Sequence, residues 1–173
     1  MIQPYDAAAL RAELRRDEGS ELEVYRCTEG KRSIGCGRNL DDVGISPAET
    51  AALGITLASV LARGITRHQE TVLLDNDIDR AEADLDRRLP WWRKLDPVRQ
   101  RVLLNMCFNM GIGRRAAPGV AAKGLLSFVN TLALIQAGQY SAAAANMLAS
   151  KWARQVHDRA ERLAMMMRTG RAA

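Results

Sequence analysis

Residues 18–37 combine the end of a helix with a tight β-hairpin, and this combination constrains the fold more than any other part of the chain. Before it, Leu10 and Leu14 lie four residues apart among charged residues, which predicts a short amphipathic helix. Gly19 is its expected end, because glycine tolerates the left-handed conformation that terminates helices. The carboxyl group of Glu18 then lies at the negative end of the helix dipole, which opposes its ionisation. A carboxyl group that stays protonated can serve as a general acid.

The hairpin is predicted from an alternating pattern and from its glycines. Residues 22–27 alternate in the manner of a strand, and a Thr-Glu-Gly turn and a glycine-containing return strand to Gly37 follow them. If this hairpin folds beside the end of the first helix, Glu18, Cys27 and Ser33 line a common cleft.

These residues resemble the signature of the phage-type lysozyme family (glycoside hydrolase family 24). In that family a Glu, eight intervening residues, an Asp or less often a Cys, five more residues and a Thr are set in such a hairpin, and Glu18, Cys27 and Ser33 fit the spacing without a gap. The resemblance continues through residues 103–111, 127–132, 144–146, 150–152, 159–160 and 168–170, so it covers nearly the whole chain. The chain departs from the commonest pattern at Cys27, where Asp is usual, at Ser33, where Thr is usual, and at Arg38, where His is usual.

The resemblance implies hydrolysis of the β-1,4 bond between N-acetylmuramic acid and N-acetylglucosamine in bacterial peptidoglycan. Glu18 matches the general acid, Cys27 and Ser33 match the groups that orient or activate the attacking water, and inversion is the implied outcome. Arg159 matches the family arginine that contacts the acid, which would favour its ionised form. The positions that match substrate-binding residues are Asn39, Phe108, Thr131 and Asn146. No metal or cofactor is implied.

Cys27 leaves several roles open. A thiol acts as a base only as the thiolate, which is a minor fraction of an ordinary thiol at neutral pH. A cation such as Arg38 would favour the thiolate, whereas an anionic Glu29 would oppose it. The residue could be a base, a nucleophile with retention of configuration, a water-positioning group, or a half-buried strand residue without chemical function. We favour water positioning with inversion.

Other functions are compatible with parts of the sequence. A lytic transglycosylase could act through Glu18 alone and form a 1,6-anhydro product. A basic helical module could instead bind the envelope or nucleic acid without catalysis, since the net charge is +5 and the pI is about 9.5. Yet the sequence has no series of base-stacking aromatics and no glycine-rich phosphate loop, and its longest basic runs are two residues. The resemblance implies peptidoglycan as the partner, and we expect no specific nucleic acid and a monomer.

The remaining pattern is mainly helical. Capping boxes open helices at Ser46 and Thr66, and apolar residues from Leu73 to Leu89 keep helical spacing until Pro90. A further helix begins at Asp96-Pro97. A glycine- and proline-containing loop and helices over residues 127–137, 141–152 and 157–169 follow it. The fold class is thus α+β, mainly α. The resemblance implies one lysozyme-like domain over residues 1–173. Its small hairpin lobe (about 19–70) and its larger helical lobe (about 75–173 plus the first helix) would be joined by the long helix.

The cysteines and the chain ends suggest where the protein works. Cys27, Cys36 and Cys107 are odd in number and have no metal-ligand spacing, and a reducing compartment disfavours a Cys27–Cys36 disulfide. The N-terminal residues do not read as a signal peptide. Residues 159–171, with arginines around Leu and Met, could touch an anionic envelope surface, but apolar residues at helical spacing usually form core. A phage or prophage endolysin fits these features: it would stay in the host cytoplasm until a holin lesion releases it to the periplasm or cell wall.

Overall fold

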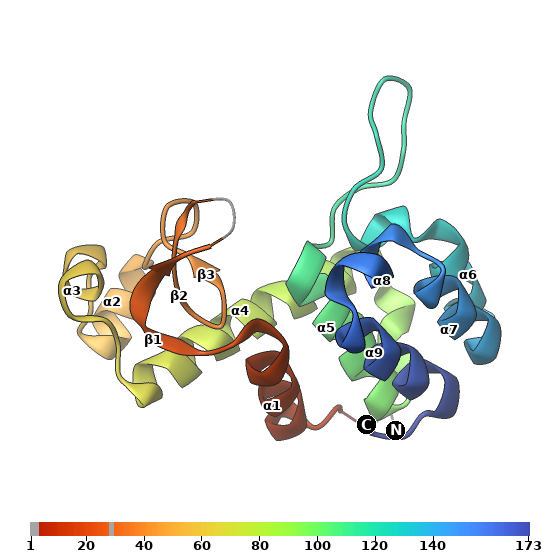
Figure 1. Cartoon of the computed structure of the whole chain (residues 1–173), viewed down its shortest axis with the longest axis horizontal. Helices are drawn as coiled ribbons and strands as arrows, with labels where there is room; N and C mark the ends of the chain where they lie inside the picture. The colour runs from red at the N-terminus through yellow and green to blue at the C-terminus, as the bar shows by residue number, and fades with distance from the viewer. Residues whose placement is uncertain (1–3, 28–29) are drawn as a thin grey trace. The chain divides into compact units, whose positions relative to one another are not determined.

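The computed structural model describes residues 4–27 and 30–173, which divide into two compact units (Figure 1). The small unit is Arg11–Asp79, and the large unit contains the residues up to Leu10 together with Arg80–Ala173. Helices α1 (Ala7–Glu18) and α4 (Arg67–Arg88) each contribute residues to both units. Most of α1 thus groups with the sheet, whereas the sequence analysis placed it with the helical lobe.

The small unit contains a three-stranded antiparallel sheet in the order β1-β2-β3. The strands are β1 (Glu21–Arg26), β2 (Arg32–Gly35) and β3 (Arg38–Asn39). The predicted pairing of the first two strands is confirmed, and β3 adds a pair that the sequence analysis did not predict. The predicted turn at Thr28 and Glu29 lies outside the described residues.

Two short helices pack on this sheet, α2 (Pro47–Leu53) and α3 (Leu57–Arg63). The predicted capping box at Ser46 is confirmed, since its side chain accepts from the N–H of Glu49 and the Glu49 side chain accepts from the N–H of Ser46. The sequence analysis did not predict α3, which opens with its own box between Thr56 and Ser59. The buried core of the unit is formed by Ile34, Leu40, Ile55, Val60, Ile65 and Leu73.

The long helix α4 is confirmed. Thr66 and Gln69 form the predicted box at its start, with the N–H of Thr66 donating to Gln69 Oε1 at 2.8 Å. It ends just before Leu89 and Pro90, because proline cannot continue a helix. A short 3₁₀ turn, η1 (Pro90–Lys94), follows α4 within the large unit.

The large unit is helical and is built around α5 (Pro97–Met110), whose residues 100–107 are all buried. Its remaining elements are η2 (Leu125–Ser127), α6 (Val129–Gln136), α7 (Tyr140–Leu148), α8 (Lys151–Val156) and α9 (Asp158–Thr169). The prediction of one helix over residues 141–152 is wrong. Ser150 divides it, because its hydroxyl donates to the carbonyl of Met147 at 2.7 Å and accepts from the N–H of Ala153 at 3.1 Å, which caps a new helix.

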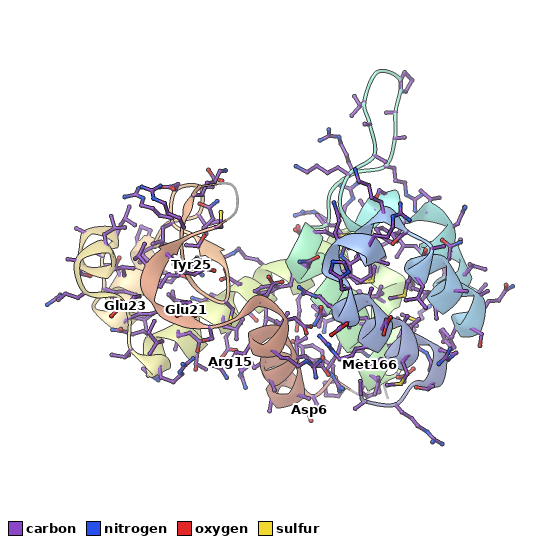
Figure 2. The ribbon with its side chains drawn as sticks, in the orientation of Figure 1. Asp6, Arg15, Glu21, Glu23, Tyr25 and Met166 are labelled. Carbon is purple, nitrogen blue, oxygen red and sulfur yellow. The ribbon has the colours of Figure 1, made fainter. Side chains whose placement is uncertain are left out.

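Helix α9 contacts α7, α5 and α8, and its apolar residues Leu163, Met166 and Met167 are buried. Met166 lies within the helical layer in Figure 2. The apolar residues of the C-terminal segment thus form core. In the described part of the chain, no helix combines the length and the apolar character needed to span a membrane.

Candidate active site

Glu18 is the last residue of α1, and ionic contacts fix this helix within the small unit. Arg11 contacts Asp75 and Arg15 contacts Glu70, with N–O distances of 2.6 and 2.7 Å, so two turns of α1 are tied to α4. Gly19 ends the helix with φ of 77°, as predicted. The half-buried Glu18 is therefore presented at a helix end whose position is well determined by packing.

The carboxylate of Glu18 lies against the turn between β2 and β3. A Cβ atom built on Gly37 would lie 3.9 Å from Glu18 Oε2, and Gly37 has φ of 82°. A glycine at this place gives the carboxylate close access to the backbone of the turn and satisfies the left-handed conformation.

The register of β1 and β2 places the other two predicted residues near each other. Tyr25 pairs directly with Ser33, and the N–H of Cys27 donates to the carbonyl of Lys31 at 2.9 Å, which continues the pairing beyond Arg26. Ser33 is buried, whereas Cys27 is half-buried. Directly paired residues project from the same face of a sheet, so Ser33 lies on the face of Tyr25.

Tyr25 connects these groups electrostatically, although the sequence analysis gave it no role. Burial raises the pKa of the Tyr25 hydroxyl, and the nearby Glu18, Cys36 and Cys27 raise it further because each disfavours a second negative charge. Figure 2 shows Tyr25 on β1. The signal was present in the sequence, since alternation already placed Tyr25 on the strand face of Cys27.

Arg38, the cation considered for the Cys27 thiol, binds two carboxylates. Its guanidinium is buried between Glu49, at 2.7 Å, and Asp77, at 2.9 Å. Burial lowers the pKa of Arg38, while Glu49 opposes this effect. Two carboxylates, one on α2 and one on α4, hold the charge of Arg38, and its effect on the thiol of Cys27 stays a prediction. Glu29, the predicted opposing anion, lies outside the described residues.

The two other cysteines are free thiols, as is Cys27. Cys36 is buried and donates to Glu70 Oε1 at 3.2 Å, and burial together with this bond raises the pKa of the Cys36 thiol to about 12. Burial raises the pKa of Cys107 to about 12 as well. Among the described residues, no group of His, Cys, Asp or Glu is arranged to hold a metal ion.

Asn39, a predicted binding residue, shapes its own turn. Its side-chain oxygen accepts from the N–H groups of Asp41 and Asp42, both at 2.9 Å, and its amide nitrogen donates to Asp42 Oδ2. These bonds give Asn39 a structural reason to be present, and its contact with sugar stays a prediction.

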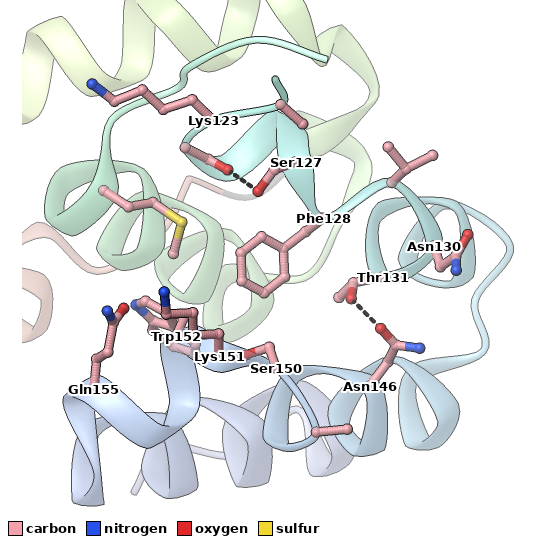
Figure 3. Close-up of a pocket in the computed structure, with 15 residues that line it drawn as sticks. Lys123, Ser127, Phe128, Asn130, Thr131, Asn146, Ser150, Lys151, Trp152 and Gln155 are labelled. Atoms are coloured by element: carbon pink, nitrogen blue, oxygen red, sulfur yellow. Dashed lines mark hydrogen bonds between the residues drawn. The ribbon is translucent and has the colours of Figure 1, made fainter. Parts of the chain in front are cut away.

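The large unit contains a cavity of about 730 Å³ that brings two predicted binding residues together (Figure 3). The buried Thr131 hydroxyl donates to Asn146 Oδ1 at 3.0 Å across the space between α6 and α7. Phe128 and Trp152 form an apolar wall, with ring centroids 6.0 Å apart in an edge-to-face arrangement. Phe108, the predicted apolar wall, is half-buried on α5 and does not line this cavity.

Arg159 is buried at the start of α9. Its Nε donates to Asn105 Oδ1 at 2.8 Å and its Nη2 to the carbonyl of Asn105 at 3.2 Å. Both bonds orient the guanidinium within the large unit. Its predicted contact with the acid stays a prediction.

Comparison with known proteins identifies the class. Residues 15–168 match the family described as phage lysozyme, and the chain belongs to this family. It is 30% identical over 167 residues to the pre-baseplate central spike protein Gp5 of Enterobacteria phage T4, which corresponds to 91% of this chain but 27% of that protein. It is also 26% and 27% identical to the probable T4-type lysozymes 1 and 2 of Dictyostelium discoideum, in each case over 94% of this chain and 95% of theirs.

The match confirms the predicted α+β, mainly α, lysozyme-like fold. The family is one of glycosidases that hydrolyse peptidoglycan, so the class of enzyme and its polymeric substrate follow from membership.

Proposed function

We propose that this protein is a muramidase that cleaves the β-1,4 bond between N-acetylmuramic acid and N-acetylglucosamine. The observation that carries the proposal is the arrangement within the small unit. The end of α1 presents Glu18 against the Gly37 turn, while the paired strands hold Cys27 and Ser33 beside Tyr25. These residues lie within the region that matches the phage lysozyme family.

Glu18 protonates the leaving glycosidic oxygen in the proposed reaction. Cys27 and the Ser33 hydroxyl hold a water that attacks the anomeric carbon from the opposite face of the ring, so the product has inverted configuration. The water adds its oxygen to the anomeric carbon and releases one proton to bulk water, while the proton given by Glu18 completes the free hydroxyl of the departing sugar. Glu18 then regains a proton from bulk water. The resemblance gives Arg159 the role of supporting the acid.

Substrate binding in the proposal uses the side chains that match the family's binding positions. Amide and hydroxyl groups bind the acetamido and hydroxyl groups of the sugars, and Phe108 supplies an apolar surface. The polar members of this set are Asn39, Thr131 and Asn146. The protein acts as a monomer in this proposal.

The biological role that we propose is host lysis by a phage or prophage endolysin. The enzyme would accumulate in the host cytoplasm and reach the periplasm or cell wall through a holin lesion. This localisation is testable, because it predicts that synthesis of the enzyme alone does not lyse the cell. Expression in the cytoplasm should leave cells intact until the inner membrane is permeabilised, and lysis without permeabilisation would contradict this localisation.

The activity is tested by digesting purified peptidoglycan and analysing the products by mass spectrometry. The wild type should release fragments that end in reducing N-acetylmuramic acid, and Glu18→Gln should release none. Glu23→Gln is the matched control, because Glu23 is an exposed carboxylate on the same hairpin. Fragments lighter by one water would instead identify a lytic transglycosylase. Binding without any cleavage would identify a non-catalytic module.

The role of Cys27 is tested with Cys27→Ala and Cys27→Ser. A water-positioning group predicts that Ser retains more activity than Ala, because its hydroxyl can also hold water. A base predicts that both variants are inactive and that wild-type activity rises with thiolate formation. NMR of the newly released anomer decides the stereochemistry, since initial β product would contradict inversion.

A further inference from the structure

Glu70 is a buried carboxylate that the proposed reaction does not use. It lies in the first turn of α4, and its side chain has 0% exposure. Arg15 binds both of its oxygens, with Nε 3.1 Å from Oε1 and Nη2 2.7 Å from Oε2. Burial opposes ionisation, but hydrogen bonds from Arg15, Cys36 and Ser20 outweigh it and lower the pKa of Glu70 to about 2. Glu70 is therefore an anion throughout the physiological pH range.

The donors to Glu70 come from three separate segments. Besides Arg15 on α1, the Ser20 hydroxyl donates to Oε1 at 3.0 Å and the Cys36 thiol donates to the same oxygen at 3.2 Å. Arg67 donates to Ser20 Oγ and so completes the cluster from α4. One carboxylate thus joins the end of α1, the turn that follows it and the turn between β2 and β3.

Each of these three segments lies next to Glu18. Arg15 is three residues before it and Ser20 is two residues after it, while Cys36 is followed by Gly37, the residue that lies against the Glu18 carboxylate. A shift of about 1 Å in a reacting group can reduce a rate about 100-fold, so the position of this helix end matters for catalysis. We propose that Glu70 is a positioning residue that fixes the carboxyl group of Glu18 for proton donation.

This inference rests on the proposed function, and a second buried cluster in the same unit provides its control. Glu49 is also buried, binds an arginine and has its pKa lowered to about 2. Its partners are Arg38, Asn76 and the N–H of Ser46. Arg38 follows Gly37 at the start of β3, but none of these partners lies on α1 or in the turn after it, and Cys36 is not among them. Replacing either glutamate by glutamine should lower stability, but only the change at Glu70 should lower the rate of the folded enzyme.

The experiment compares Glu70→Gln with Glu49→Gln on soluble, uncrosslinked peptidoglycan strands, at a temperature where circular dichroism shows both variants folded. We expect kcat of Glu70→Gln to fall about 10- to 100-fold with little change in KM, since Glu70 is buried and does not reach substrate. Glu49→Gln should keep the wild-type kcat. Equal kcat values for the two variants would overturn the inference. An inactive wild type would instead refute the proposed function.

A milder variant keeps the inference testable if Glu70→Gln does not fold. Ser20→Ala removes one donor from the half-buried turn and should also reduce kcat, by a smaller factor. Where both variants fold, their effects should be less than additive, because both act through the same hydrogen bond. Full kcat in Ser20→Ala, or strict additivity, would count against a positioning role.

A second, independent observation concerns the exposed ribbon of residues 113–124, between α5 and η2. Arg114 and Lys123 exchange two backbone hydrogen bonds of 2.9 Å, and Ala117 and Val120 exchange bonds of 3.0 and 2.8 Å. All residues from 114 to 123 are exposed, and the ribbon stands out from the helices of the large unit (Figure 1). This segment is a defined structure that contributes little to the core.

Glycines at its base show that the chain is built to form the ribbon. A Cβ atom on Gly113 would lie 1.9 Å from the carbonyl oxygen of Lys123, and one on Gly124 would lie 2.7 Å from the carbonyl oxygen of Gly111. Only glycine allows the two backbones to approach this closely, and both positions also have positive φ.

The charged residues of this region are all basic. The sequence contains no Asp or Glu between Asp96 and Asp158, whereas the ribbon carries Arg114, Arg115 and Lys123. Its tip is formed by small apolar residues, including Val120 with 41% exposure. Basic residues behind a small apolar tip are suited to a bilayer surface with anionic phospholipid headgroups.

We infer that the ribbon docks the protein on anionic lipid. The apolar side chains of the C-terminal segment, which the sequence suggested for this contact, are buried in α9. The ribbon instead presents its cations and its tip outward. In this inference it supplies a contact with an anionic partner, the kind of partner that the net charge of +5 favours.

The test measures partition onto phosphatidylcholine vesicles with and without phosphatidylglycerol. Arg114→Gln with Arg115→Gln should weaken binding to the anionic vesicles about 30-fold. The matched control is Arg87→Gln with Arg88→Gln, which removes equal charge from the end of α4 and should weaken binding much less. Equal losses, or wild-type binding to peptidoglycan but not to anionic vesicles, would overturn the inference.

Discussion

The buried cluster around Glu49 should make the stability of the protein depend on pH in a way that one substitution removes. Arg38 and Glu49 are almost completely buried, with side-chain exposures of 2% and 3%, and Asp77 binds the same guanidinium. Burial of the Glu49 carboxyl opposes ionisation. Hydrogen bonds from Asn76, from the N–H of Ser46 and from Arg38 outweigh this effect and lower the pKa from 4.5 to about 2.

The size of the effect follows from this shift. Each pKa unit corresponds to about 1.4 kcal/mol, so the ionised Glu49 stabilises the fold by about 3 kcal/mol at pH 7. Because the pKa is lower in the folded protein, this contribution is complete above the unfolded value of 4.5 and is lost as the pH falls toward 2. Roughly 1.5 kcal/mol should remain at pH 3. The value at pH 7 agrees with the typical cost of about 3–5 kcal/mol for breaking a buried ion pair.

Urea unfolding of wild type and Glu49→Gln, followed by circular dichroism between pH 7 and pH 2.5, measures this difference directly. We expect a loss of about 3 kcal/mol in the free energy of unfolding at pH 7, about half of that at pH 3, and convergence of the two proteins near pH 2. The exposed Glu23→Gln should stay within about 0.5 kcal/mol of wild type. A difference that stays constant from pH 7 to pH 2.5 would show that the substitution acts through packing, and the electrostatic reasoning would be refuted.

Two further predictions concern the cysteines and the ribbon. At pH 8 a thiol reagent should modify the half-buried Cys27 first. Cys36 and Cys107 should react only on unfolding, because both are buried and the pKa of each is raised to about 12. Equal rates of modification at the three thiols would contradict this prediction. Gly113→Ala should lower the Tm more than Gly119→Ala. Both positions have positive φ, which costs about 1 kcal/mol for alanine, but only at Gly113 would the added Cβ also clash with the backbone. Equal Tm values would show that the base of the ribbon relaxes freely.

Local signals in the sequence were sufficient for much of the fold. Capping residues at Ser46, Thr66 and Asp96 and the apolar spacing before Pro90 marked helices that the structure confirms. The same method failed at residues 141–152. Apolar spacing continues through Ser150, and its hydrogen bonds to the backbone on both sides become visible only in three dimensions.

The spacing of Glu18, Cys27 and Ser33 was likewise readable from the sequence, because a helix end and a hairpin are local structures. Their roles in catalysis remain predictions. Partnerships between distant residues could not be read. The order of charged residues in the sequence does not reveal that Arg38 forms ion pairs with Glu49 and Asp77. It also does not reveal that Glu70 forms hydrogen bonds to segments next to Glu18.

The sequence by itself thus determined most of the elements, the family and the candidate catalytic hairpin of this protein, since each depends on short-range pattern and spacing. Only the tertiary structure decided which buried carboxylate receives which arginine, which thiols are protected and where an exposed cationic ribbon stands. The physical reason is that burial and pairing depend on contacts between residues far apart in the chain. A buried ionisable group has lost its contacts with water, so its protein partners determine its charge state.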